Sequence, residues 1–135
     1  MGDCIFCKIA NGEIPSATIY EDEKFRVILD LGPASKGHAL ILPKEHYADI
    51  YEIPEDLAGE AYKLAAKMTK KLTQALHCDG FNVVQNNKEV AGQTVFHFHM
   101  HLIPRYEGDQ VGLTWAPGTL TDEVKQDILD KLKEI

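Results

Sequence analysis

Hydrophobic and polar residues alternate most clearly over residues 96–103, Phe-His-Phe-His-Met-His-Leu-Ile. A period of two is typical of a β-strand, so the pattern places His97, His99 and His101 on one face and the intervening apolar residues on the other. Neighbouring side chains on one face of a strand lie roughly 6 to 7 Å apart. The segment therefore predicts a half-buried strand that carries a row of three imidazoles.

Four other segments have the length and composition of strands. Residues 18–20 and 25–29 flank the polar turn 21–24 and predict a hairpin. Residues 37–42 form an apolar run that ends before a proline, and residues 81–85 alternate. Together with the histidine segment they predict about five strands.

Helical periodicity is strongest over residues 54–76, where apolar side chains recur every three or four positions. Pro54 suits the first helical position and Gly80 suits the stop. The apolar segment 4–9 predicts one or two helical turns. A last helix is predicted to start at Thr121, with an apolar stripe formed by Val124, Ile128, Leu132 and Ile135.

These elements favour an α+β fold in which an antiparallel sheet carries one long and one C-terminal helix. The 135 residues, 44% of them hydrophobic, suffice for one domain with an ordinary core. We therefore treat 1–135 as a single domain, with a core over 1–105 and a C-terminal segment and helix over 106–135.

Net charge narrows the range of ligands. A formal charge of -7 and a pI near 5.3 argue against a general nucleic-acid binder, which needs a basic face. A small phosphate-bearing ligand stays possible, because backbone N–H groups can hold it. Neither a membrane-spanning apolar run nor a basic and then apolar leader is evident, so we expect a cytoplasmic protein that does not engage membranes.

The cysteines indicate a metal site rather than disulfides. Three is an odd number, which fits a reducing compartment better than a disulfide framework. Cys4 and Cys7 form a C-x-x-C pair, and a redox motif of this kind should follow a strand for which there is no room before Cys4. We therefore favour zinc binding over redox chemistry for Cys4 and Cys7, and we interpret Cys78 as a structural thiol.

The row of three histidines predicts a functional site, but it does not distinguish a catalytic site from a metal site. A lone histidine would most simply be a satisfied core residue, but half of the six histidines stand in strict alternation here. Imidazole serves as nucleophile, acid or metal ligand. The preceding loop, residues 86–94, concentrates neutral donors where an anion could sit. Asp30 is either a turn-capping carboxylate or a group that binds sugar hydroxyls.

With these residues in view, the chain resembles the histidine triad (HIT) family, whose mark is His-φ-His-φ-His-φ-φ with φ hydrophobic. The similarity includes the Gly-Gln-Thr-Val lead-in at 92–95 and the opening segment 4–15. It extends to Leu29-Asp30 with Gly32-Pro33, to Gly37-His38, to Pro43-Lys44-x-His46 and to Asn86. Residues 4–105 look like the HINT-like branch, which contains the nucleoside phosphoramidases, whereas the segment after Tyr106 is only loosely comparable.

The resemblance implies a homodimer with one continuous sheet that binds purine nucleotides and cleaves a bond to the α-phosphorus. By position, His99 is similar to the nucleophile that forms a nucleotidyl-histidine, which water then hydrolyses. His101 matches the residue that hydrogen-bonds the phosphate and leaving-group side, and His38 matches a histidine that supports the cluster. A neutral imidazole is a competent nucleophile near pH 7, and a covalent intermediate divides one hard displacement into two.

The resemblance also assigns binding residues. The phosphate positions are Asn86, Gly92, Gln93 and Thr94, and the ribose carboxylate is Asp30. The nucleobase wall corresponds to Phe6, Ile9, Leu29 and Leu31. In similar bacterial members a Cys₂His₂ set holds zinc, which corresponds here to Cys4, Cys7, His46 and His97. Such a closed set suits a structural ion, so the chemistry itself needs no metal.

The leaving group stays open. A phosphoramidate, with an amine leaving group, is the first expectation. A dinucleoside polyphosphate hydrolase is the nearest enzyme alternative, since the triad itself does not distinguish the two. A nucleotide-binding regulator with little turnover is an alternative of another class, and the intact His99 and His101 weigh against it.

Overall fold

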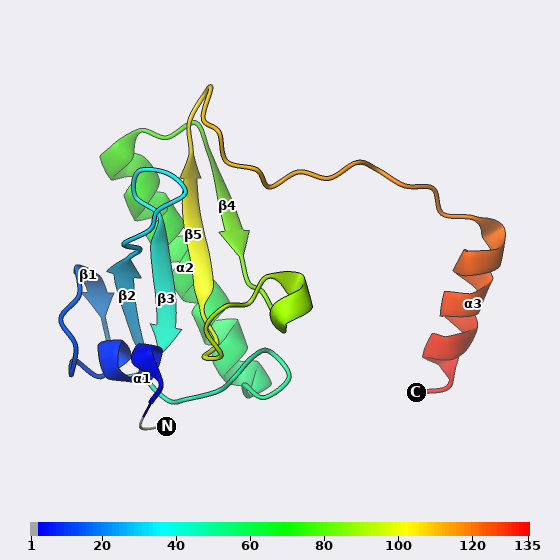
Figure 1. Cartoon of the computed structure of the whole chain (residues 1–135), viewed down its shortest axis with the longest axis horizontal. Helices are drawn as coiled ribbons and strands as arrows, with labels where there is room; N and C mark the ends of the chain where they lie inside the picture. The colour runs from blue at the N-terminus through cyan, green and yellow to red at the C-terminus, as the bar shows by residue number, and fades with distance from the viewer. Residues whose placement is uncertain (1–2) are drawn as a thin grey trace.

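The computed structural model describes residues 3–135 as an α+β fold built on a five-stranded antiparallel sheet (Figure 1). The strand order is β1-β2-β3-β5-β4, and all neighbouring pairs are antiparallel. The predicted fold class is confirmed. The elements are α1 (Ile5–Ala10), β1 (Thr18–Glu21), β2 (Phe25–Leu29), β3 (Ala39–Pro43), α2 (Glu55–Leu76), β4 (Gly80–Val84), the 3-10 helix η1 (Glu89–Ala91), β5 (Met100–Arg105) and α3 (Asp122–Lys133).

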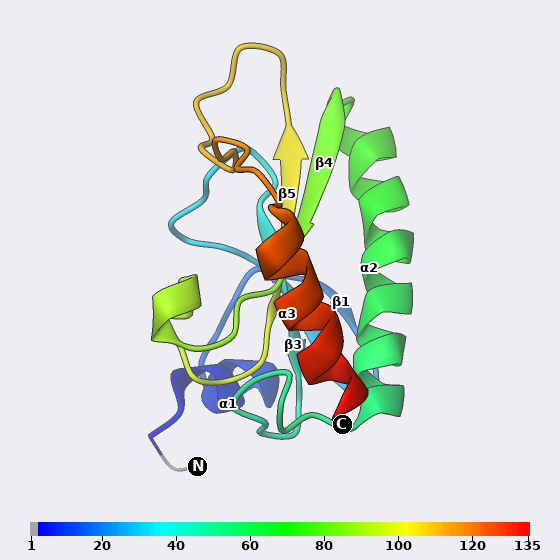
Figure 2. The ribbon, with the colours of Figure 1, turned by 90° about the vertical axis from the view of Figure 1, so that its right-hand side faces the viewer.

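The two faces of the sheet are covered differently. The long helix α2 packs on one face, and α1 with the loop around η1 lies on the other (Figure 2). The main core forms between α2 and the sheet, where Val27, Ile41 and Leu102 are fully buried against Ala61 and Ala65. The alternation of the histidine segment is thereby explained, since its apolar residues belong to this core and its histidines point to the opposite face.

The strand predicted over residues 96–103 is shorter than the alternation indicates, because β5 begins only at Met100. Backbone groups of the residues before Met100 form hydrogen bonds with partners outside the sheet. The N–H of Phe98 donates to the carbonyl of Tyr47 (2.6 Å), and the carbonyl of His97 accepts from the ring of His99 (2.7 Å). The prediction of a regular strand over residues 96–99 is therefore wrong, although the side chains keep their alternating faces.

The end of α2 also differs from the prediction. Gly80 does not stop the helix but begins β4, and the left-handed C-cap is His77, with φ 54°. Pro54 precedes the first helical turn as the N-cap. A close contact fixes the turn before β3 against this helix end, because a Cβ on Gly37 (φ +92°) would clash with the Cδ1 of Leu76.

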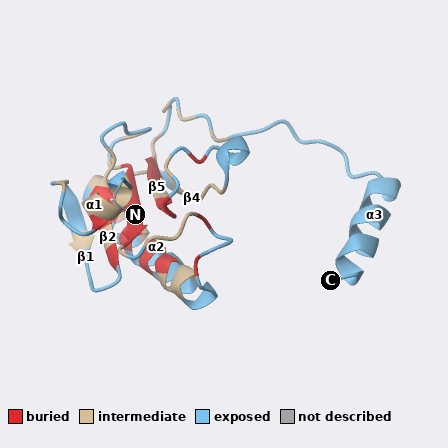
Figure 3. Ribbon diagram, turned by 60° about the horizontal axis from the view of Figure 1, so that its bottom comes forward, coloured by how far each residue is buried: buried red, intermediate tan, exposed pale blue. Residues whose placement is uncertain are grey.

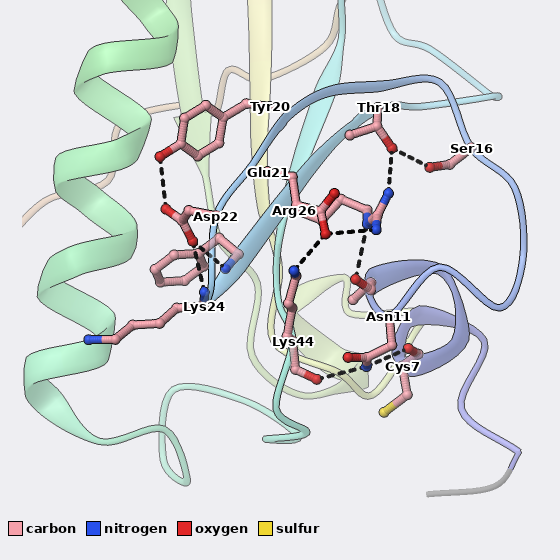
Figure 4. Close-up of polar contacts among 12 residues, drawn as sticks. Cys7, Asn11, Ser16, Thr18, Tyr20, Glu21, Asp22, Lys24, Arg26 and Lys44 are labelled. Atoms are coloured by element: carbon pink, nitrogen blue, oxygen red, sulfur yellow. Dashed lines mark hydrogen bonds and ion pairs between the residues drawn. The ribbon is translucent and has the colours of Figure 1, made fainter.

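Polar contacts attach α1 to the edge of the sheet (Figure 4). The Nε of Arg26 donates to the carbonyl of Ala10 (3.0 Å), the last residue of α1. The side-chain amide of Asn11 donates to the carbonyls of Cys7 (2.9 Å) and Lys44 (3.1 Å). These bonds hold the residues of α1 over the face of the sheet that carries the histidines.

The C-terminal segment leaves the body of the molecule. After β5 the chain runs without helix or strand to α3, which lies apart from the sheet (Figures 1 and 3). Every residue from Thr114 to Ile135 is exposed. Thr121 is the N-cap as predicted, since its side chain accepts from the N–H of Val124. Within residues 3–135 no helix combines the length and apolar character needed to cross a membrane.

Candidate functional site

The histidines predicted to carry chemistry cluster on the sheet face opposite α2. The ring centroids of His99 and His101 lie 5.0 Å apart, and those of His101 and His38 lie 5.1 Å apart. Phe6 from α1 approaches the ring of His99 edge-on at 4.9 Å. Strand β5 and the segment that leads into it, the turn before β3 and helix α1 together therefore build one continuous group of rings.

A backbone carbonyl fixes the tautomer of His99. Its Nδ1 lies 2.7 Å from the carbonyl oxygen of His97, which can only accept, so Nδ1 carries the proton and donates. The lone pair is then on Nε2. Burial lowers the pKa of His99, so the ring is neutral at pH 7. The geometry thus provides one buried, uncharged imidazole nitrogen that is able to act as a nucleophile.

His101 has the opposite tautomer to His99, and His38 sets it. The N–H of Ala34 donates to the Nδ1 of His38 (2.9 Å), so the proton of His38 is on Nε2. That Nε2–H lies 2.9 Å from the Nδ1 of His101 and donates to it. His101 must therefore carry its own proton on Nε2. Burial, with His99 and His38 nearby, lowers the pKa of His101 to about 4, which keeps this N–H donor uncharged.

A cavity of about 450 Å³ adjoins these rings, between α1, the segment before β1, and β2. Its walls are mostly apolar and include a few polar side chains, as in a site for a mixed ligand. Eight of the predicted site residues line it: Phe6, Ile9, Leu29, Asp30, Leu31, Thr94, His99 and His101. The structure thus brings together the residues expected for base, ribose and chemistry. His38 lies behind His101 and does not line the cavity.

Asp30 caps a turn and also lines the cavity. One carboxylate oxygen caps the turn, accepting from the N–H of Gly32 (2.8 Å). The other oxygen lies 3.5 Å from the Nε2 of His38. Because the side chain also lines the cavity, turn capping does not remove it from the site.

Three of the residues predicted for the phosphate do not line the cavity. The Gln93 side chain is buried and holds its own loop together, accepting from the N–H of Lys88 (2.7 Å) and donating to the carbonyl of Ala48 (2.6 Å). Gly92 lies against the side chain of Asn86, because a Cβ added to Gly92 would be 3.5 Å from the Nδ2 of Asn86. Their phosphate-binding role stays a prediction, and Thr94 is the one member of that set at the cavity.

Sequence reasoning missed the rest of the cavity wall. Ile28 and Leu40 could have been found, because the strands over 25–29 and 37–42 are apolar on both faces, and a second apolar face needs a cover or a ligand. Segment 14–17 carried no such signal. The missed lining residues are Ile5, Ile14, Pro15, Ser16, Ala17, Ile28, Leu40 and Val95.

The four residues predicted to hold zinc converge beside the histidine row. Their ligand atoms all lie within 4.8 Å of one another. The Nδ1 atoms of His46 and His97 are 3.3 Å apart, and the Sγ of Cys7 lies 3.2 Å from His46 and 3.4 Å from His97. A tetrahedral zinc with ordinary bond lengths would separate two nitrogens by about 3.3 Å, and a nitrogen and a sulfur by about 3.6 Å. The donor set therefore fits the ion.

Protonation at this cluster agrees with the same assignment. The Nε2–H of His97 donates to the carbonyl of Pro43 (2.8 Å), which leaves the lone pair on Nδ1, toward the thiols. Burial lowers the pKa of His97 to about 4, so the ring is available as a neutral ligand. Burial, and then the neighbouring Cys4, raise the pKa of Cys7 to about 11. Such a thiol becomes a thiolate only beside a cation.

Comparison with known proteins identifies the family. The family model described as HIT domain matches residues 11–108, most of the chain. This protein belongs to the HIT family. Among its relatives is a protein of Candida albicans named adenosine 5'-monophosphoramidase HNT1, 42% identical over 97% of this chain and 90% of that protein.

Solved structures of HIT proteins have the same fold. A crystal structure from Streptococcus mutans UA159 aligns with a TM-score of 0.94 and 37% identity over 99% of this chain and 85% of that chain. Such a score requires the C-terminal segment to superpose too, since residues 106–135 are more than a fifth of the chain. A zinc-bound histidine triad family protein from Mycobacterium smegmatis aligns with a TM-score of 0.79 and 34% identity, covering 98% of this chain and 97% of that one.

Proposed function

We propose that this HIT protein hydrolyses purine nucleotide conjugates at the α-phosphorus, with nucleoside phosphoramidates as the preferred class, through a nucleotidyl-His99 intermediate. The observation that carries the proposal is the pair of opposite tautomers on adjacent rings. His99 has a free lone pair on Nε2, whereas His101 has an N–H there. Attack on phosphorus needs the first, and stabilisation of a negatively charged phosphoryl group needs the second.

In the first step the Nε2 lone pair of His99 attacks the α-phosphorus and a P–N(imidazole) bond forms. The bond from phosphorus to the amine breaks, and the amine takes a proton from water. His99 becomes positively charged, and its Nδ1–H donates to the carbonyl of His97, which stabilises that charge. In the second step another water attacks phosphorus and gives a proton to the hydroxide left by the first step, the P–N bond breaks, the nucleoside monophosphate leaves, and His99 is neutral again.

The surroundings support a nucleotide as substrate. The apolar wall, with Phe6, Ile9 and Leu29, suits a nucleobase, and Asp30 can accept from ribose hydroxyls. Thr94 contributes a hydroxyl donor for the phosphate, with Asn86, Gly92 and Gln93 as further candidates on the same loop. The name of the Candida albicans relative supports a phosphoramidate of adenosine monophosphate in particular.

The zinc that we propose for Cys4, Cys7, His46 and His97 has a structural role. Cys4 is the N-cap of α1 and Cys7 lies in its first turn, and His97 lies two residues before His99. A bound ion would therefore connect the nucleobase wall to the segment that carries the nucleophile, and it would supply no reaction chemistry of its own.

A comparison of rates tests the proposal. An adenosine monophosphate–amine conjugate and a diadenosine polyphosphate should be assayed side by side, with wild type, His99→Asn and the control His77→Asn. His77 is exposed and left-handed, a conformation that Asn tolerates. We expect fast turnover of the conjugate by wild type and control and none by His99→Asn. Faster turnover of the diadenosine compound would favour the dinucleoside polyphosphate hydrolase, and binding without turnover would favour the regulator.

A further inference from the structure

Loop 86–94, between β4 and β5, is held in place by polar contacts rather than by apolar packing. The two hydrophobic cores found within residues 3–135 include no member of it. Most of its residues are exposed, and it lies on the sheet face that carries the histidines (Figure 2). Thr94, at its end, nevertheless lines the cavity. The place of Thr94 in the site therefore depends on the contacts that anchor the loop.

Lys88 closes this loop with its backbone. Its carbonyl accepts from the N–H groups of Ala91 and Gln93, both at 3.1 Å, and its own N–H donates to the side-chain oxygen of Gln93 (2.7 Å). The closure requires φ 77° and ψ 156° at Lys88, a conformation that is almost restricted to glycine. A lysine at this position is unfavourable for the backbone, so we expect its side chain to provide a contact that glycine lacks.

The side chain of Lys88 pairs with a buried carboxylate. Its Nζ lies 2.9 Å from the Oδ2 of Asp49, a residue that is only 2% exposed. The Oδ1 of Asp49 accepts from the N–H of Tyr51 (3.1 Å), and the ammonium lies 5.2 Å from the centroid of the Tyr51 ring. Because a buried carboxylate without a cation is strongly unfavourable, this pair stabilises the conformation of both residues.

The pair belongs to a row of contacts between the loop and segment 48–50. On one side of it, the side-chain oxygen of Asn87 accepts from the N–H of Ile50 (2.7 Å). On the other side, the side-chain amide of Gln93 donates to the carbonyl of Ala48 (2.6 Å). The contact of Lys88 joins opposite charges and is therefore the strongest of the three.

We propose that Lys88, through Asp49, is a positioning residue that holds loop 86–94 where Thr94 can donate to the phosphate of the substrate. This inference rests on the proposed function, because it assigns the loop to the phosphate. The nucleobase wall comes from other elements, mainly α1 and β2. Loss of the ion pair should therefore weaken the binding of the phosphate and leave the binding of the nucleoside unchanged.

Hydrogen exchange tests the anchoring without a nucleotide, so its outcome is independent of the proposed function. Asp49→Asn removes the charge of the buried partner, and the matched control Glu60→Gln does the same to the exposed pair of Glu60 with Lys24 (3.0 Å). We expect faster exchange of the Ala91 and Gln93 amides in Asp49→Asn and wild-type rates in the control. Wild-type rates in both variants would overturn the proposal.

Calorimetric titration with adenosine monophosphate and with adenosine then tests the consequence for the phosphate. Lys88→Gly suits the backbone but lacks the ammonium, whereas Lys88→Arg keeps the charge. We expect Lys88→Gly to weaken the monophosphate about tenfold, roughly the loss of one hydrogen bond, and adenosine by less than about twofold. Lys88→Arg should bind both compounds as the wild type does.

The outcomes of this titration separate the inference from the function on which it rests. Wild-type affinity for the monophosphate in Lys88→Gly would mean that only the backbone matters at this position, and the proposal would be rejected. Equal losses for the two compounds would also reject it, since they would indicate a general structural effect. A wild type that binds the monophosphate no more tightly than adenosine would reject the phosphate site, and with it the proposed function.

Discussion

At the scale of single residues, two backbone groups determine which ring nitrogen carries the proton in His99, His38 and His101. The carbonyl of His97 sets the proton of His99, and the N–H of Ala34 sets that of His38 and, through it, that of His101. Neither group is a side chain, so the division of roles follows from the path of the backbone. All four rings stay neutral together because burial lowers the pKa of each.

We therefore propose that His38 is a positioning residue, so its removal should disturb the tautomer of His101. In His38→Ala the Nδ1 of His101 loses its donor, and we expect kcat to fall about 10- to 100-fold while KM changes little. The ¹⁵N chemical shifts of His101 should then show a mixture of tautomers. Unchanged shifts together with a loss of kcat would contradict the positioning role.

The lowered pKa of His101 predicts a loss of stability in acid. Its folded-state pKa of about 4 lies below the ordinary 6.5, so the unfolded chain binds the proton more tightly. The contribution is fully present above pH 6.5 and falls as the pH drops toward 4, by about 3 kcal/mol at that pH. Urea unfolding across this range should give a shallower decline in His101→Asn than in wild type, and equal declines would contradict the assignment.

At the scale of elements, α1 carries residues of both the proposed zinc site and the proposed nucleobase wall. Cys4→Ser should remove bound zinc and raise KM for the nucleotide, because α1 also carries Phe6 and Ile9. Cys78→Ser is the matched control, since Cys78 lies near Thr73 at the other end of the molecule. Metal analysis and KM measured on both variants provide the check. If metal analysis finds no zinc in the wild type, the proposed zinc site is rejected, whereas the proposed role of His99 is unaffected.

The contact between the turn before β3 and the end of α2 predicts a contrast between two glycines. Gly37→Ala introduces a clash with Leu76 and a strained left-handed residue, so we expect a loss of roughly 2 to 4 kcal/mol in unfolding free energy. Gly59→Ala, in α2 with nothing within 4 Å of an added Cβ, should stabilise by about 0.5 to 1 kcal/mol. Denaturant unfolding of both variants tests this, and a neutral Gly37→Ala would contradict the contact.

Periodicity predicted the elements well and their ends less well. The alternation at residues 96–103 correctly assigned the faces, but it could not reveal that the Tyr47 carbonyl and the His99 ring take the backbone hydrogen bonds before Met100. Gly80 was a plausible stop for α2, yet His77 adopts the left-handed cap. Hydrogen bonds between distant segments leave no periodic signal in sequence.

At the scale of the whole molecule, the site depends on segments that are far apart in the chain. The similarity of residues 4–105 to the HIT family predicted which residues would contact the base and the ribose, carry the chemistry and hold the metal. It could not give the lining from segment 14–17, the enclosed position of Gln93 or the relay from Ala34. The amphipathic pattern of α3 was visible in the sequence, but its separation from the body was not.

The stereochemical course at phosphorus is the most direct test of a covalent nucleotidyl-His99 intermediate. Each in-line displacement inverts the phosphorus, so hydrolysis through nucleotidyl-His99 inverts it twice. With a substrate made chiral at the α-phosphorus by one sulfur, and with isotopically labelled water, the account predicts a product of retained configuration. Inverted configuration would mean that water attacks the substrate directly, and it would contradict the covalent role of His99.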